Sequence, residues 1–113
     1  METLRNWKSQ SKRKPLLLMG ARQVGKTFIL KMFGSLEYAN TLYINFENNQ
    51  RVCKLFEASL DPAVILRALS IEMDATIIAG KTLIIFDEVQ ECPNALNSLK
   101  YFCENASDQH IVA

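Results

Sequence analysis

Apolar positions along the chain fall into short unbroken runs separated by longer stretches in which they recur at helical spacing. Runs at residues 16–19 and 82–86 are typical of buried strands, the run at 41–46 is rich in the β-branched and aromatic residues of a strand, and an apolar run also begins at Ile111. Helix-like stretches lie between these runs. Strands that alternate with helices predict an α/β domain of three layers with a mainly parallel sheet.

Helix boundaries are marked by local signals. The residues after Gly25 predict a helix over 27–33 that ends near Gly34. Asp61 and Pro62 supply an N-cap and a first-turn proline for a second helix, which the apolar spacing extends to Gly80. Pro93 opens another helix, and residues 2–14 favour a short one. The segment 47–59 predicts no definite element.

The composition narrows the class of protein. A chain of 113 residues with 49% hydrophobic residues predicts a single domain over residues 1–113. Its net charge of +1 excludes a strong global attraction to nucleic acid or to an anionic membrane. No apolar run is long enough to cross a bilayer and no signal peptide is present, so we expect a cytoplasmic protein. Three cysteines without metal-ligand spacing predict free thiols that serve packing.

A glycine-rich motif follows the first apolar run. Residues 20–27 match G-x-x-x-x-G-K-[ST], the Walker A phosphate-binding loop of P-loop NTPases, and have the required strand before and helix after them. Backbone N–H groups of such a loop converge on phosphates at the positive end of a helix. The predicted nucleotide-binding residues are Gly20, Ala21, Arg22, Gln23, Val24, Gly25, Lys26, Thr27 and Phe28.

The motif assigns separate roles within the loop. Lys26 is expected to reach the β and γ phosphates and to take part in catalysis, and the Thr27 hydroxyl is expected to ligate Mg²⁺. For Arg22 two interpretations stay open, a solvent-exposed position and a contact with a phosphate.

Two acidic residues follow the third apolar run. Asp87 is predicted to hold Mg²⁺ as a Walker B aspartate, at the carboxyl edge of the sheet where open α/β sheets bind ligands. Glu88, one residue further along an extended chain, would face the γ phosphate and activate a water for hydrolysis. The alternative is that both acids only cap the next helix.

The expected nucleotide is ATP. The chain has no Asn-Lys-x-Asp element, with which guanine-specific proteins read their base. Leu4 or Trp7 could line an adenine pocket, although such residues near an N-terminus more often belong to a core or an interface.

The stretches RKPLLLMGARQVGKT, YINFE and TLIIFDEVQECPNALNSLKYF resemble the ATPase domain of the AAA_14 family over nearly the whole chain. The resemblance implies a P-loop core with strand order 1-4-3-2. It also implies a sensor residue, a fifth strand, an arginine finger and usually a DUF4143 domain. None of these parts occurs in the sequence, which is therefore expected to be a truncated N-terminal fragment with poor turnover of its own.

The resulting expectation is a Mg²⁺-dependent ATPase domain of an AAA-like hydrolase. A nucleotide-dependent switch with negligible turnover is the alternative, and a phosphoryl transferase is less favoured because no arginine follows Glu88 to form a lid. The expected partners are ATP or ADP and, in the full-length protein, further copies of the chain. Contact with nucleic acid stays open, and contact with a membrane is not expected.

Overall fold

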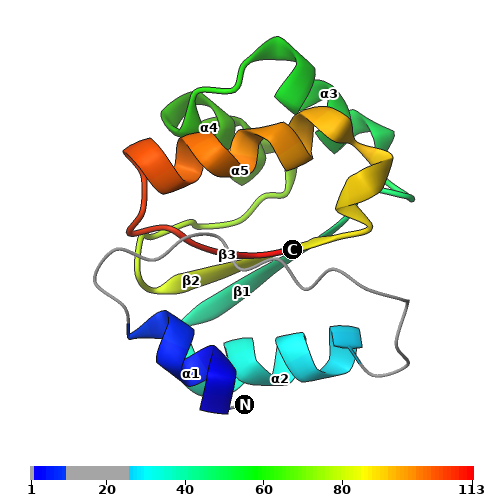
Figure 1. Ribbon diagram of the computed structural model, residues 1–113. Helices are drawn as coiled ribbons and strands as arrows, with labels where there is room; N and C mark the ends of the chain where they lie inside the picture. Colours follow the sequence, from blue (N-terminus) through cyan, green and yellow to red (C-terminus); the bar gives the residue numbers. More distant parts are fainter. Residues whose placement is uncertain (1, 10–25) are drawn as a thin grey trace.

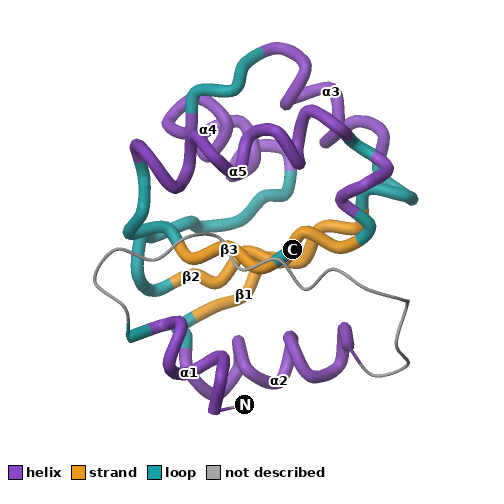
Figure 2. The backbone as a smooth tube through the Cα atoms, viewed as in Figure 1, coloured by secondary structure: helices purple, strands orange, loops and turns teal. Residues whose placement is uncertain are grey.

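The structure, a computed structural model, describes residues 2–9 and 26–113, with side chains from 5–9 and 27–113. Its centre is a sheet of parallel strands in the order β1-β2-β3, in which Asn45 lies opposite Asp87 and Ile85 opposite Val112. These strands are β1 (Asn40–Asn45), β2 (Thr82–Asp87) and β3 (His110–Val112). The chain leaves β1 and β2 on the same side of the molecule (Figure 2).

Helices cover both faces of this sheet (Figure 1). One face carries α1 (Glu2–Lys8) and α2 (Lys26–Glu37). The other face carries α3 (Gln50–Ala58), α4 (Pro62–Glu72) and α5 (Pro93–Asn105). A short 3-10 helix, η1 (Val89–Glu91), joins β2 to α5. The described part of the chain therefore has the helix–sheet–helix layers that the apolar pattern predicts.

The central strand β2 shows why its sequence lacks polar alternation. Leu83 and Ile85 pack into an apolar cluster beneath α1 and α2, whereas Ile84 and Phe86 pack into the larger cluster under α3, α4 and α5. All four side chains are buried. A strand that is covered on both faces needs apolar side chains on both, and residues 83–86 supply them.

The order of the described strands agrees with part of the expected order. The strands at 40–45, 82–87 and 110–112 are neighbours in that sequence, as positions 2, 3 and 4 of the order 1-4-3-2 require. The predicted first strand, residues 16–19, lies outside the described residues, so the complete order stays a prediction.

The prediction that the first long helix ends near Gly34 is wrong, because α2 continues through Gly34 to Glu37. The glycine has a packing role instead. A Cβ added at Gly34 would lie 2.1 Å from the Thr41 Oγ1 atom on β1, far inside van der Waals contact. Gly34 thus lets α2 approach the sheet closely at this point.

The predicted start of α4 is confirmed and its predicted end is wrong. The Asp61 side chain accepts a hydrogen bond from the Ala63 N–H at 3.1 Å, and Pro62 occupies the first turn. The helix ends at Glu72 rather than near Gly80, and Asp74 then adopts a left-handed backbone with φ of 49°. The segment without a definite prediction contains α3, whose N-cap is Asn49.

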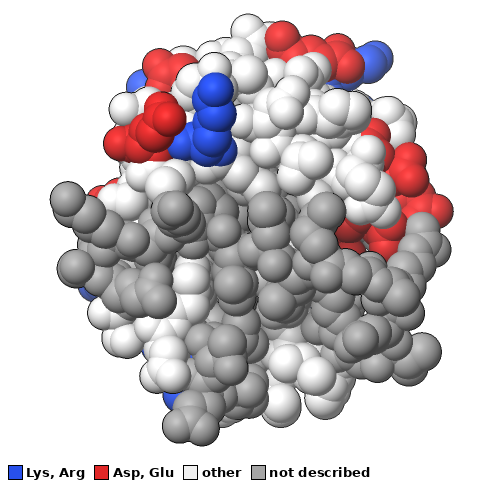
Figure 3. All heavy atoms as spheres, in the orientation of Figure 1, with Lys and Arg blue, Asp and Glu red and all other residues white. Residues whose placement is uncertain are grey.

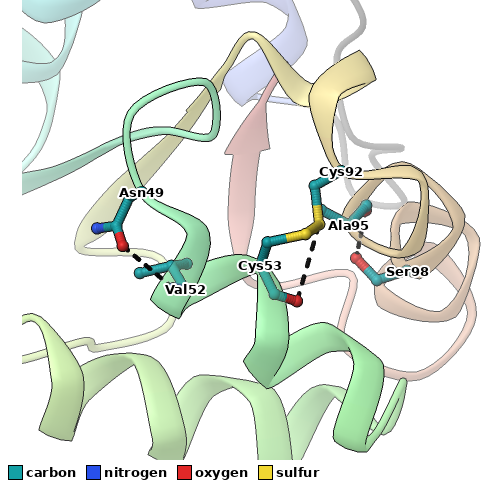
Figure 4. The surroundings of a disulfide bond; sticks show 6 residues. All are labelled: Asn49, Val52, Cys53, Cys92, Ala95 and Ser98. Atoms are coloured by element: carbon teal, nitrogen blue, oxygen red, sulfur yellow. Dashed lines mark hydrogen bonds between the residues drawn. A yellow bond between two sulfur atoms is a disulfide. The ribbon is translucent and has the colours of Figure 1, made fainter.

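The expectation of three free thiols is also wrong. Cys53 on α3 and Cys92, which directly precedes α5, form a disulfide with a Cα–Cα distance of 5.8 Å (Figure 4). The Cys92 sulfur also lies 3.8 Å from the carbonyl oxygen of Cys53. Cys103 is free. Cysteine spacing could not predict this pair because the two residues meet only through the packing of α3 against α5.

Candidate functional site

The amino end of α2 and the carboxyl end of β2 meet at one edge of the sheet. Thr27, in the first turn of α2, donates a hydrogen bond from its Oγ1 atom to Oδ2 of Asp87, the last residue of β2, at 3.0 Å. Both side chains are partly exposed. The fold therefore brings together a hydroxyl and a carboxylate that lie 60 positions apart in the sequence.

Asp87 has two further donors. The Tyr43 hydroxyl, from β1, donates to the same Oδ2 atom at 2.5 Å. The backbone N–H of Glu88 donates to Oδ1 at 3.0 Å. Three donors from different parts of the chain thus hold the Asp87 carboxylate in one orientation.

The tyrosine in this cluster is also fixed through its ring. The Lys31 ammonium, one helical turn after Thr27, lies 4.2 Å from the Tyr43 ring centroid, within the range of a cation–π contact. Burial raises the pKa of the Tyr43 hydroxyl, and its hydrogen bond to Asp87 and the negative charge of Asp87 add to this rise. Hydrogen bonds from Asn45 and Thr27 act in the opposite direction without cancelling it. The hydroxyl therefore stays protonated and acts as a donor at neutral pH.

Glu88 does not continue the extended chain, contrary to the prediction. The strand ends at Asp87, and Glu88 turns into a left-handed backbone with φ of 54° and ψ of 42°. The direction of its side chain is therefore set by this turn and not by strand alternation. Its Oε2 atom accepts a hydrogen bond from Gln90 Nε2 at 2.6 Å.

The alternative prediction, that Asp87 and Glu88 only cap the next helix, is not supported by a capping hydrogen bond from a side chain. Glu88 occupies the N-cap position of η1, but no side chain makes a capping hydrogen bond there. The N-cap position of α5 is Cys92, which also lacks such a bond. A non-glycine residue with a left-handed backbone directly after the hydrogen-bonded Asp87 carboxylate is the kind of strained position that often marks a functional site.

Several predicted site residues lie outside the described part of the chain. These are Gly20, Ala21, Arg22, Gln23, Val24 and Gly25, and the Lys26 side chain. Lys26 itself begins α2, and Phe28 is 69% exposed on that helix. The first turn of an α-helix has N–H groups with no partner inside the helix, so the end of α2 that adjoins Asp87 has the polarity that suits an anion.

The side-chain oxygens of Thr27 and Asp87 are of the chemical type that binds magnesium. Mg²⁺ prefers hard oxygen ligands and keeps several waters, so one hydroxyl and one carboxylate are an adequate protein share. Among the described residues there is no group of three or more His, Cys, Asp and Glu side chains that could hold a metal by itself. Acidic side chains do gather on the side of the surface where β2 leads into η1 (Figure 3).

Trp7 belongs to the core. It is 5% exposed and packs edge-on against His110, with ring centroids 5.5 Å apart. The interpretation of Trp7 as part of an adenine pocket therefore has no support from its position, and the Leu4 side chain lies outside those described.

Sequence reasoning missed Tyr43 as a member of this site. The residue appeared only as an aromatic position in a predicted strand. The only feature that could have indicated its role is the position of its strand beside β2 in a parallel sheet, which brings the carboxyl ends of both strands to a common edge. No local motif marks it.

A parallel sheet between two helical layers, with a helix beginning beside the carboxylate at its carboxyl edge, defines an α/β protein with a P-loop-like fold. The chain belongs to the AAA_14 family, since the family model, described as an AAA domain, matches residues 12–113. Membership indicates a nucleotide-binding, ATPase-like protein. Neither the curated proteins nor the solved structures contain a match to this chain. Among the helices in the described ranges, none has the length and apolarity that a membrane span requires.

Proposed function

We propose that the protein binds ATP together with Mg²⁺ at the carboxyl edge of the sheet and hydrolyses it. The observation that carries this proposal is the 3.0 Å contact between Thr27 and Asp87. The Walker A and Walker B assignments, made independently from two distant segments, both need these residues to be neighbours. Membership of the AAA_14 family supports the same function.

In this proposal the phosphates of ATP bind at the amino end of α2. Backbone N–H groups of Gly20, Ala21, Arg22, Gln23, Val24 and Gly25 donate to the phosphates, and the chain continues into α2 through Lys26, Thr27 and Phe28. Lys26 provides the positive charge for the β and γ phosphates. The positive end of α2 adds to the attraction, since the helix dipole is equivalent to roughly half an elementary charge at that end.

Thr27 and Asp87 are the residues that would hold Mg²⁺. The ion, when bound, offsets negative charge on the β and γ phosphates and on the leaving group. The fixed orientation of the Asp87 carboxylate fits this role because a ligand that is already in place loses little entropy on binding. The hydrogen bonds from Thr27 and from the Glu88 N–H contribute to that orientation.

Glu88 is the proposed general base. It follows the metal-holding aspartate directly, and its left-handed backbone places it in the turn that leaves the site edge. A carboxylate there takes a proton from the attacking water as the water adds to the γ phosphate. The Glu88 side chain is restricted by a hydrogen bond from Gln90, whose Nε2 atom lies 2.6 Å from the Glu88 Oε2 atom.

Calorimetric titration and a phosphate-release assay on two variants test this function. Lys26→Ala should weaken ATP binding by at least about tenfold, because it removes the charge on the phosphates. Glu88→Gln should keep binding and lower turnover by about 10²- to 10⁴-fold, the usual share of a general base. Lys81→Ala, which removes an exposed lysine just before β2, is the matched control and should change neither quantity.

Two results would contradict the proposal. Wild-type protein that is folded but binds no ATP excludes a nucleotide site. Undiminished turnover of Glu88→Gln removes Glu88 from the mechanism while leaving the binding site intact.

A further inference from the structure

The Asp87 carboxylate is held by more than the two motifs that predict it. Its Oδ1 atom accepts from the Glu88 N–H, and its Oδ2 atom accepts from both Thr27 and Tyr43. Thr27 and Asp87 are both proposed to face the metal, so the bond between them does not by itself fix either side chain relative to the rest of the fold. Tyr43 is the side-chain donor that comes from outside both motifs.

Tyr43 is well placed to act as a fixed donor. It lies on β1, whose backbone is paired with β2 in parallel register from Asn40 to Asn45. Its half-buried ring contacts the apolar cluster that contains Leu83 and Ile85, and the Lys31 ammonium lies over the ring. A tyrosine has few rotatable bonds, so packing of the ring fixes the position of the hydroxyl.

We propose that Tyr43 is a positioning residue for the magnesium site, holding the Asp87 carboxylate through the hydroxyl contact at Oδ2. The inference rests on the proposed function and adds to it a residue that neither Walker motif contains. The same contact has a direct physical consequence: a carboxylate that already accepts a bond from a fixed donor needs less reordering when it takes a metal. Residues that hydrogen-bond to a metal ligand without touching the metal typically change metal affinity or activity by about 10- to 100-fold.

If Tyr43 positions the metal ligand, loss of its hydroxyl should change how strongly Mg²⁺ raises nucleotide affinity, and should not change nucleotide affinity in the absence of the metal. Tyr43 contacts Asp87 and Thr27, the two proposed metal ligands, and its ring lies under Lys31, but Tyr43 itself belongs to neither the phosphate loop nor the first turn of α2. Loss of its hydroxyl should therefore weaken only the gain in affinity that Mg²⁺ provides. A tyrosine needed merely for folding would lower stability, or would weaken binding with and without the metal alike.

The experiment compares Tyr43→Phe with Tyr101→Phe, which removes a hydroxyl from a half-buried ring on α5, on the opposite face of the sheet. ADP is titrated calorimetrically in excess Mg²⁺ and again in EDTA, so no turnover is needed. In Tyr43→Phe the ratio of the two affinities should fall by about 10- to 100-fold, with the affinity in EDTA unchanged. Tyr101→Phe should keep the wild-type ratio.

A second pair of variants separates positioning from general damage. In an Asp87→Ala background, Tyr43→Phe should change the metal dependence no further, because the carboxylate on which it acts is gone. A wild-type ratio in Tyr43→Phe overturns the inference and leaves the proposed function standing. An equal loss in Mg²⁺ and in EDTA, or a further loss in the Asp87→Ala background, overturns it as well. Absence of ADP binding to the folded wild-type protein overturns both proposals.

Discussion

Glu88 and Asp74 are the non-glycine residues with positive φ among those described, at 54° and 49°. A left-handed backbone costs a residue with a side chain roughly 1–2 kcal/mol, because the Cβ atom approaches the following carbonyl oxygen. Glycine does not have this cost, although its greater freedom in the unfolded chain reduces the gain by about 0.5–1 kcal/mol. Both positions therefore hold strain that a glycine would relieve.

We predict that Glu88→Gly raises the free energy of unfolding by about 0.5–1 kcal/mol, measured by urea denaturation without nucleotide. The same variant should lose the proposed ATP hydrolysis, because the carboxylate is removed. Stability gained at the expense of activity is the pattern expected where strain is retained for function.

Asp74→Gly is the matched control at the residue scale. Asp74 is exposed and lies in the turn after α4, away from the carboxyl edge of the sheet. It should gain similar stability and keep wild-type turnover. A fall in stability for Glu88→Gly, with the expected gain for Asp74→Gly, would show that side-chain contacts of Glu88 outweigh its backbone strain.

At the scale of elements, the Cys53–Cys92 disulfide fastens α3 to the start of α5. Both residues are buried, with Cys92 fully covered. The link closes a segment whose ends are 39 positions apart, and a loop of that length corresponds to about 4 kcal/mol in the chain-entropy relation. This segment includes α4 and β2, so the disulfide restricts a large part of the unfolded chain.

Reduction should therefore lower the free energy of unfolding by about 2–4 kcal/mol, the usual range for a disulfide. The measurement is urea denaturation with and without a thiol reductant, together with thiol counting. A Cys53→Ala/Cys92→Ala double variant should match the reduced protein and no longer respond to reductant. Cys103→Ala should respond as the wild type does, since Cys103 is the free thiol. Three titratable thiols in the unreduced, denatured protein would contradict the disulfide.

Over the whole molecule, the sheet separates two apolar clusters, and Trp7 links α1 to β3 through the smaller one. Trp7 contacts His110 edge-on, and His110 in turn shares a hydrogen bond with the Tyr38 hydroxyl. Ion pairs from Arg5 and Lys8 to Glu37 add to the attachment of α1 to α2. The first described helix is thus part of the common core and not an appended arm.

Trp7→Ala should accordingly destabilise the whole fold by about 3–5 kcal/mol, the cost of a large cavity in a core. Far-ultraviolet circular dichroism during urea unfolding measures this loss. Ile71→Ala is the control, because Ile71 is 76% exposed on α4 and its truncation should change stability by no more than about 0.5 kcal/mol. A loss confined to the seven residues of α1, with the main transition unchanged, would show that α1 folds independently.

Local sequence patterns alone were sufficient to predict several elements of this molecule. The strand near 82–86 follows from an apolar run and the strand near 41–46 from its β-branched and aromatic residues. The helix starts at Pro62 and Pro93 follow from proline and capping chemistry. These signals act between neighbouring residues, so the sequence contains them directly. The Walker motifs are local as well, which is why Thr27, Asp87 and Glu88 could be proposed before any contact was known.

The tertiary structure decided what depends on distances between remote segments. The close approach of α2 to Thr41 explains why Gly34 lies within this helix instead of ending it, and the disulfide follows from the packing of α3 beside α5. The site gained Tyr43 in the same way, through strand pairing. Motif spacing specifies which chemical groups a chain carries, whereas the pairing of strands and the packing of helices determine which of those groups can touch.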